Sequence, residues 1–181
     1  MLGCEILMIN NLETGDTGNG DIIEIIEKHG RMVYRLAYAY LHNQHLADDA
    51  YQDVFLRVVR KYNDFRKDSS VETWLTRITI NVCKDYLKSA WVKRTVHVDE
   101  DRHADSDMEK SLIEEDENKR LYMAVLTLKA NFRSVILLYY YSEYDTETIA
   151  KILKISAGTV RSRLHRARAQ LKKTLKDEIQ M

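Results

Sequence analysis

The stretch KISAGTVRSRLHRARAQLKKTLK, residues 154–176, predicts a helix with one apolar side and one basic side. At 100° per residue the apolar side of a helix over about 157–176 collects Val160, Leu164, Ala167, Leu171 and Leu175. The preceding segment YDTETIAKIL predicts a short helix over 145–153, with a tight break at KIS. Asp145 and Ser156 are the expected N-caps of the two helices, because their side-chain oxygens can accept from free backbone N–H groups. Two helices joined in this way form a helix-turn-helix, whose second helix enters the major groove of DNA.

The basic side of this second helix carries side chains that suit nucleic acid. Arginine can bond two acceptors of guanine at once, and serine or histidine can bond several base edges. The predicted base readers are therefore Arg161, Ser162, His165 and Arg166. Further along the helix lie Arg168, Lys172 and Lys173, which are predicted to contact phosphates. Phosphate contacts position a protein without reading sequence. A solvated face, or a helix lying on an anionic membrane, is the alternative.

The net charge of the chain is zero, but its charges are strongly segregated. The 181 residues include 28 bases and 28 acids. Residues 31–94 and 119–181 are both basic overall, whereas residues 95–118 hold 10 acids and 2 bases. Such an acidic, apolar-poor segment is typical of a solvated linker. The sequence thus predicts a flexible tail (1–20), an N-terminal domain (21–94), an acidic linker (95–118) and a C-terminal helix-turn-helix domain (119–181).

The apolar periodicity is helical almost throughout and predicts an all-α fold of two small helical domains. No segment shows the alternating pattern of a strand. Helices are expected at about 21–29, 31–42, 46–63, 71–90, 111–128, 132–141, 145–153 and 157–176.

The expected helix over 71–90 carries a second polar stripe. Its buried side holds Val71, Leu75, Ile78 and Val82, and its polar stripe holds Arg77, Asn81, Lys84 and Lys88. Trp74 lies at the border between the two sides. A cationic track beside an aromatic ring suits single-stranded nucleic acid, because phosphates follow the cations and a base stacks on the ring. In the alternative interpretation, Trp74 belongs to the core and the cations are merely solvated.

The expected helix over 46–63 exposes a leucine among acids. Its predicted outer face comprises Asp49, Gln52, Asp53 and Leu56. Acids around an apolar spot are unfavourable for DNA but suit a basic protein partner. A solvated face is again the alternative.

Other features set limits on the function. Cys4 and Cys83 form no ligand pattern, and His42 with His45 is interpreted as a helix-end loop, so no metal is expected. No signal peptide or spanning segment is evident, and the cysteine usage suits a reducing cytoplasm. No nucleophile, cofactor-binding or phosphate-loop pattern is present, so we expect neither catalysis nor a small-molecule substrate.

Together these segments resemble the extracytoplasmic-function (ECF) group of bacterial RNA polymerase sigma factors. The resemblance rests on YRLAYAYL, LADDAYQDVFLRV, DFRKDSSVETWLTRITINVCKDYLK and ETIAKILKISAGTVRSRLHRARAQLK, in the order and spacing of that family. It implies that the face from Asp48 to Phe55 docks on the β′ coiled coil of core polymerase, which adds Asp48 to the predicted polymerase contacts Asp49, Gln52, Asp53 and Leu56. It further implies that the C-terminal domain contacts the β flap. It also implies that RSRLHRAR reads the −35 element and that an anti-sigma factor is a partner.

The resemblance gives the loop RKDSSVE a role at the −10 element. Asp68, Ser69 and Ser70, with Trp74, Asn81 and Lys84 of the following helix, would melt the DNA there and capture an extruded base. The pocket must then repay the stacking that the base loses. Together with the −35 reader, this predicts a sigma subunit that recruits core polymerase to promoters.

The chain departs from the family pattern at three points. Lys129 stands where a proline is frequent, so Asn131 is expected to cap the next helix. Tyr139 replaces a frequent arginine. Lys154 replaces a frequent glycine, and a positive φ there would cost about 1 kcal/mol.

Two other functions fit parts of the sequence. A helix-turn-helix regulator that does not replace sigma explains the C-terminal domain but leaves the Trp74 stripe unused. A helical adaptor that contacts membrane or RNA through its basic helix predicts no sequence-dependent DNA binding.

Overall fold

The computed structural model describes residues 19–65, 68–96 and 112–179, and every element in them is a helix. The first three α-helices are α2 (Asn19–Leu41), α3 (Gln44–Lys61) and α4 (Val71–Val96), with a 3-10 turn η1 (Tyr62–Asp64) between the last two. The second half contains α5 (Leu112–Thr127), α6 (Ala130–Ile136), a π-helical turn η2 (Leu137–Tyr141), α7 (Thr146–Leu153) and α8 (Ala157–Ile179). The all-α prediction is confirmed. Residues 1–18 of the predicted tail and 97–111 of the predicted acidic linker lie outside the described residues. The described ends of both segments are helical, since α2 begins at Asn19 and α5 begins at Leu112.

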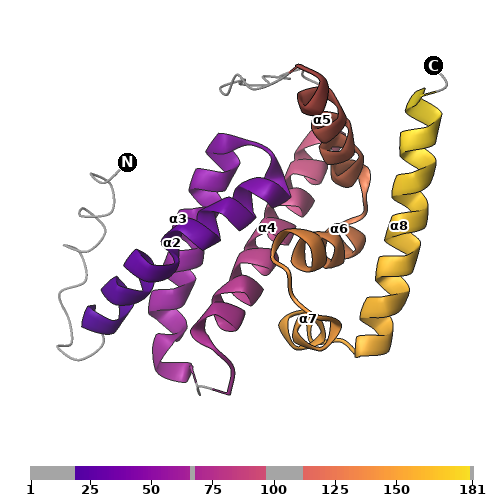
Figure 1. Ribbon diagram of the computed structural model, residues 1–181. Coiled ribbons are helices and arrows are strands. Elements are labelled where there is room, and N and C mark those ends of the chain that lie inside the picture. The colour runs from indigo at the N-terminus through magenta and orange to yellow at the C-terminus, as the bar shows by residue number, and fades with distance from the viewer. Residues whose placement is uncertain (1–18, 66–67, 97–111, 180–181) are drawn as a thin grey trace.

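The N-terminal half is a three-helix unit in which α2, α3 and α4 pack on one another (Figure 1). One helix spans residues 19–41, so the predicted break near Gly30 is wrong. Gly30 is buried where α2 crosses α3, and a Cβ there would lie 2.9 Å from the Tyr51 hydroxyl oxygen. The glycine therefore allows close packing of two helices and does not end one.

The C-terminal half packs α6 and α7 against α8, which forms one side of the molecule in Figure 1. The predicted cap at Asn131 is wrong, because α6 already begins at Ala130 and Lys129 occupies the cap position without a side-chain hydrogen bond. The following π-helical turn presents Tyr139, Tyr140 and Tyr141 at the surface.

The two halves share one hydrophobic cluster. Its buried members include Val33, Leu36, Val54 and Leu75 from the first half and Leu138, Ile149, Val160 and Leu164 from the second. Tyr40, at the end of α2, is fully buried, and its hydroxyl donates to the Ala130 carbonyl oxygen (2.9 Å). Burial raises the pKa of Tyr40 to about 12. The helix-turn-helix is thus fixed against the N-terminal unit, with α4 in contact with both α6 and α7.

Candidate nucleic-acid interface

The turn between α7 and α8 is built by the two predicted caps. The Asp145 Oδ1 atom accepts from the Thr148 backbone N–H (2.6 Å), and Ser156 Oγ accepts from that of Thr159 (3.0 Å). The first contact lowers the pKa of Asp145. Between the helices, Lys154 adopts the left-handed conformation with φ 53° and ψ 49°. Lys154 is therefore in the conformation in which a side chain other than that of glycine costs about 1 kcal/mol.

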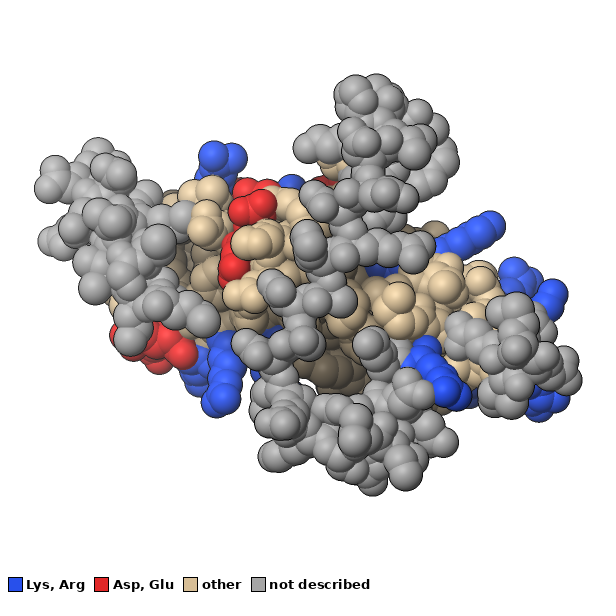
Figure 2. Space-filling model, turned by 90° about the horizontal axis from the view of Figure 1, so that it is seen from above, with Lys and Arg blue, Asp and Glu red and all other residues tan. Residues whose placement is uncertain are grey.

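The second helix, α8, is anchored by its apolar stripe and exposes its basic side. Val160, Leu164 and Ala167 are buried against the cluster that includes Ile149 and Ile152. On the other side, the exposed residues are Arg161, Ser162, His165, Arg166, Arg168, Lys172 and Lys173. Figure 2 shows Lys and Arg at the end of the molecule formed by α8, with the visible acidic atoms away from that end. The structure therefore brings all predicted −35 residues to one helix face.

Two of these arginines have neighbours that the sequence reading missed. Arg161 forms a long, exposed ion pair with Glu147 (3.5 Å), an interaction that contributes little in water. Arg168 is held more firmly, because its Nε donates to the Tyr140 hydroxyl (2.8 Å) and its guanidinium lies over the Tyr139 and Tyr140 rings. The run of three tyrosines at 139–141 was the available signal. These rings orient Arg168 on the exposed face.

The α4 stripe is divided between solvent and the C-terminal half. Asn81 and Lys88 are exposed, whereas Arg77 and Lys84 are half-buried. The Arg77 guanidinium donates to the backbone oxygens of Ile152 (3.0 Å) and Lys151 (2.6 Å) in α7. Burial lowers the pKa of Lys84, and the nearby charge of Arg163 lowers it further.

Trp74 is half-buried and stacks on Phe65, with ring centroids 4.6 Å apart. The structure therefore supports part of each interpretation of Trp74: one face packs on a neighbour, yet the side chain is not fully enclosed. Phe65 is an aromatic neighbour that the sequence reading missed.

The predicted −10 loop lies next to an open hollow of about 470 Å³. Ser69 and Ser70 line it, together with Phe65, Tyr62 and Asp21. Ser70 is also the cap of α4, since its Oγ accepts from the Thr73 backbone N–H (3.1 Å). Asp68 is exposed.

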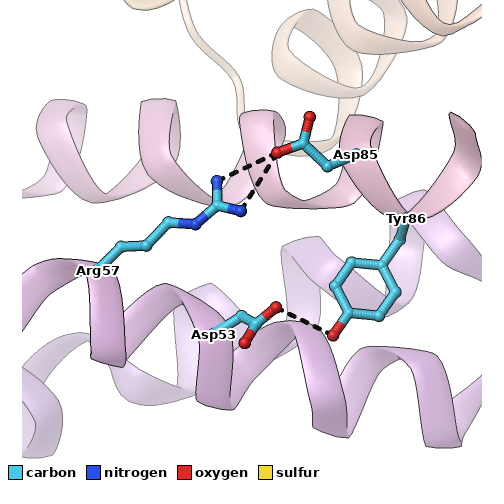
Figure 3. Close-up of polar contacts among 4 residues, drawn as sticks. All are labelled: Asp53, Arg57, Asp85 and Tyr86. Carbon is cyan, nitrogen blue, oxygen red and sulfur yellow. Dashed lines mark hydrogen bonds and ion pairs between the residues drawn. The ribbon is translucent and has the colours of Figure 1, made fainter. Parts of the chain in front are cut away.

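The predicted polymerase-binding face of α3 contains exposed and structural members. Asp49, Gln52 and Leu56 are exposed, Leu56 at 42%. Asp53 is half-buried, and its Oδ2 accepts from the Tyr86 hydroxyl of α4 (3.1 Å; Figure 3).

Asp48 of this face, and Arg57 next to it on α3, also make contacts within the N-terminal unit. One turn after Asp53, Arg57 pairs with Asp85 of α4 (3.2 Å; Figure 3). The half-buried Asp48 lies near Tyr34, whose pKa is raised by burial and by that carboxylate. The α3 face therefore contacts the rest of the unit through Asp48 and Asp53. Its other members, Asp49, Gln52 and Leu56, are exposed.

Within the described ranges, no three acidic, histidine or cysteine side chains gather in a way that could hold a metal ion. In the same ranges no helix is long and apolar enough to cross a membrane.

Comparison with known protein families finds a match for each half of the chain. Residues 25–92 match Sigma-70 region 2, and residues 118–171 match Sigma-70 region 4. The ECF sigma factor SigM of Mycobacterium tuberculosis is 32% identical over 152 residues, which cover 84% of this chain and 76% of SigM. This chain belongs to the ECF sigma factors. It is an RNA polymerase sigma factor that directs transcription from promoters.

Other relatives agree with this assignment. SigW of Bacillus subtilis is 28% identical over 185 residues and is matched over 99% of its length. SigE of Mycolicibacterium smegmatis is 35% identical, and the chain spans 59% of it.

Two solved structures share the fold. The Bartonella quintana sigma factor RpoE, in complex with the anti-sigma factor NepR, matches with a TM-score of 0.67 at 21% identity, covering 86% of this chain and 97% of that one. CnrH, in complex with the cytosolic domain of CnrY, matches with a TM-score of 0.65 at 22% identity, covering 94% and 96%.

Proposed function

We propose that this sigma factor divides its work between three surfaces: the outer face of α3 for core polymerase, the exposed face of α8 for the −35 element, and the α4 stripe with its preceding loop for the −10 element. The observation that carries the proposal is the arrangement of α8. Its apolar stripe is buried while all seven predicted DNA-binding side chains are exposed on the other side. A helix that lay on a membrane would need that apolar stripe to be free.

The −10 role is supported by the side chains near the start of α4. Ser69 and Ser70 line the hollow beside Phe65, and Trp74 lies behind that ring. Aromatic rings and hydroxyls at the edge of a hollow suit an unstacked base. Further along α4 lie Asn81, Lys84 and Lys88, which would contact the phosphates next to that base. Melting of the −10 DNA would then come from trapping the extruded base.

The polymerase role is supported by the exposed Leu56, which lies one turn after Gln52 on a helix whose Asp49 is also exposed. We propose that this surface docks on the β′ coiled coil and that the C-terminal half contacts the β flap. The protein would act in the cytoplasm without catalysing a reaction itself, and an anti-sigma factor would keep it from polymerase.

Transcription with purified components tests the proposal. Core polymerase is supplied with this protein, no other sigma factor and a library of genomic fragments, and transcript starts are sequenced. We expect starts that share −35 and −10 motifs, and a set of starts identical to that of core polymerase alone would refute the proposal.

Leu56→Ala tests the docking surface, with the affinity for purified core polymerase measured by direct titration. Leu56 is exposed, so its truncation should leave folding intact but weaken binding to core polymerase. Lys61→Ala, an exposed change at the end of the same helix, is the matched control. Equal polymerase affinity for the two variants would contradict the assignment of this face.

A further inference from the structure

A π-helical turn places three consecutive tyrosines on the surface beside α8. In an α-helix Tyr141 would lie on the same side as Leu137, four residues earlier, and Leu137 is buried. The Ser142 backbone N–H instead donates to the Leu137 carbonyl oxygen, five residues earlier (3.0 Å). This pattern adds a residue to the turn and leaves Tyr139, Tyr140 and Tyr141 exposed together. Insertions of this kind are frequent at functional sites.

Two of these rings hold Arg168 of α8. The Tyr140 hydroxyl accepts from Arg168 Nε (2.8 Å). The guanidinium carbon lies 5.4 Å from the centre of the Tyr139 ring and 5.5 Å from that of the Tyr140 ring. Helix α6, which leads into the π-helical turn, packs on α8 and keeps the two segments side by side (Figure 1). Tyr139 stands where an arginine is frequent in the family; a second cation there would repel Arg168, whereas a ring attracts it.

These contacts leave the charge of Arg168 without a counter-ion. A phenol and two ring faces are uncharged, whereas Arg161 pairs with the Glu147 carboxylate. Among the residues that the structure describes, neither Nη group of Arg168 has a hydrogen-bond acceptor. Arginine carries five N–H donors in a planar fork, so the occupied Nε leaves both Nη groups for the oxygens of a phosphate. Because the guanidinium is already held, less side-chain freedom is lost when it binds.

Arg168 belongs to the basic row of the proposed −35 face. At 100° per residue, a sector of about 60° on α8 contains Arg161, His165, Arg168 and Lys172. All four side chains are exposed. Tyr140 lies next to this row and is 58% exposed. Since its hydroxyl accepts from Arg168, the hydroxyl hydrogen remains available to a second acceptor.

We propose that Tyr140 and Arg168 form one phosphate-binding unit at the edge of the −35 face, which makes Tyr140 a DNA contact outside the helix-turn-helix. Arg168 binds a backbone phosphate through its Nη groups. Tyr140 holds the guanidinium and donates its hydroxyl hydrogen to an oxygen of the same phosphate. The unit reads no base, since phosphate contacts position a protein without specifying sequence. This inference rests on the −35 role proposed above for α8.

Tyr140→Phe tests the unit, because it keeps the ring beside the guanidinium and removes only the hydroxyl. Tyr141→Phe is the matched control, since it removes a hydroxyl from the next residue of the same turn, whose ring lies against Arg35. Both tyrosines are exposed, so neither change should alter urea unfolding. Tyr140→Phe is also combined with Arg168→Ala.

Fluorescence anisotropy measures the affinity of the full chain for a DNA duplex of arbitrary sequence over a series of salt concentrations. We expect Tyr140→Phe to weaken binding by about 2- to 12-fold, and the control to bind as the unchanged chain does. Arg168→Ala should weaken binding and lower the salt slope by about one. In the Arg168→Ala background, Tyr140→Phe should cost less than about 2-fold, because the two groups act on one phosphate.

Equal affinities for Tyr140→Phe and its control would overturn the proposal, and so would the same fold-loss from Tyr140→Phe in both backgrounds. A chain that did not bind the duplex even at low salt would also overturn it.

The transcription assay separates this inference from the proposed function. If promoter transcripts appear but Tyr140→Phe binds the duplex as its control does, the sigma role stands and the phosphate unit fails. If the coupled loss appears but no protein form yields promoter transcripts with core polymerase, the phosphate unit stands and the sigma role of these surfaces fails.

Discussion

Asp49 and Asp53 are both predicted polymerase contacts, but the structure gives them different roles in stability. Asp53 accepts a hydrogen bond from the Tyr86 hydroxyl, whereas Asp49 is exposed. A hydrogen bond to a charged group contributes about 1.5–3 kcal/mol, and the half-exposed position of this one reduces that to about 1–2 kcal/mol. Asp53→Ala should lower the free energy of unfolding by that amount. Asp49→Ala should change it by less than about 0.5 kcal/mol.

The comparison is well controlled because both changes replace the same residue type in the interior of the same helix. The gain in helix propensity from alanine is then common to both variants. Urea unfolding, followed by circular dichroism, measures the two free energies. A cycle with Tyr86→Phe isolates the pair: Asp53→Ala should cost much less in the Tyr86→Phe background. Equal free energies for the two single variants, or a coupling below about 0.3 kcal/mol, would refute the structural role of Asp53.

Polymerase binding then separates structure from recognition. If the α3 face docks as proposed, Asp49→Ala should weaken binding to core polymerase without a loss of stability. A loss of binding by Asp53→Ala alone would instead indicate that the acid acts only by positioning α3 on α4. Measurement well below the unfolding midpoint keeps both variants folded.

Three further outcomes are expected. Lys154→Gly should stabilise the protein by up to about 1 kcal/mol, because glycine adopts a positive φ without strain, while Lys154→Ala should change nothing in urea unfolding. Arg161→Ala should lose about 1–3 kcal/mol of discrimination at one −35 base, and Lys172→Ala should weaken binding uniformly and lower its salt slope by about one, both measured by DNA titration. Between pH 10 and 12 the unfolded chain loses the Tyr40 proton while the folded chain keeps it, so stability should fall as pH rises. Tyr40→Phe should reduce that slope in urea unfolding at each pH.

Local chemistry made the helix-turn-helix predictable. The caps at Asp145 and Ser156 need only a side-chain oxygen three residues before a free N–H, and both are confirmed. The prediction at Gly30 was wrong because a glycine inside a helix and a glycine that ends one look alike until the neighbouring helix is known. The cap at Asn131 failed because α6 starts one residue earlier than the asparagine. Such outcomes depend on contacts across the fold, which periodicity does not encode.

The contact between the two halves illustrates that limit most clearly. Both halves are basic overall, which argues from charge alone against their packing together. Arg77 and Arg133 nevertheless stabilise the contact, because each donates to carbonyl oxygens at the C-terminal end of a helix. That end carries a partial negative charge, so no carboxylate is needed. Backbone carbonyls carry no signature in a sequence, so no count of acids and bases could have predicted either pairing.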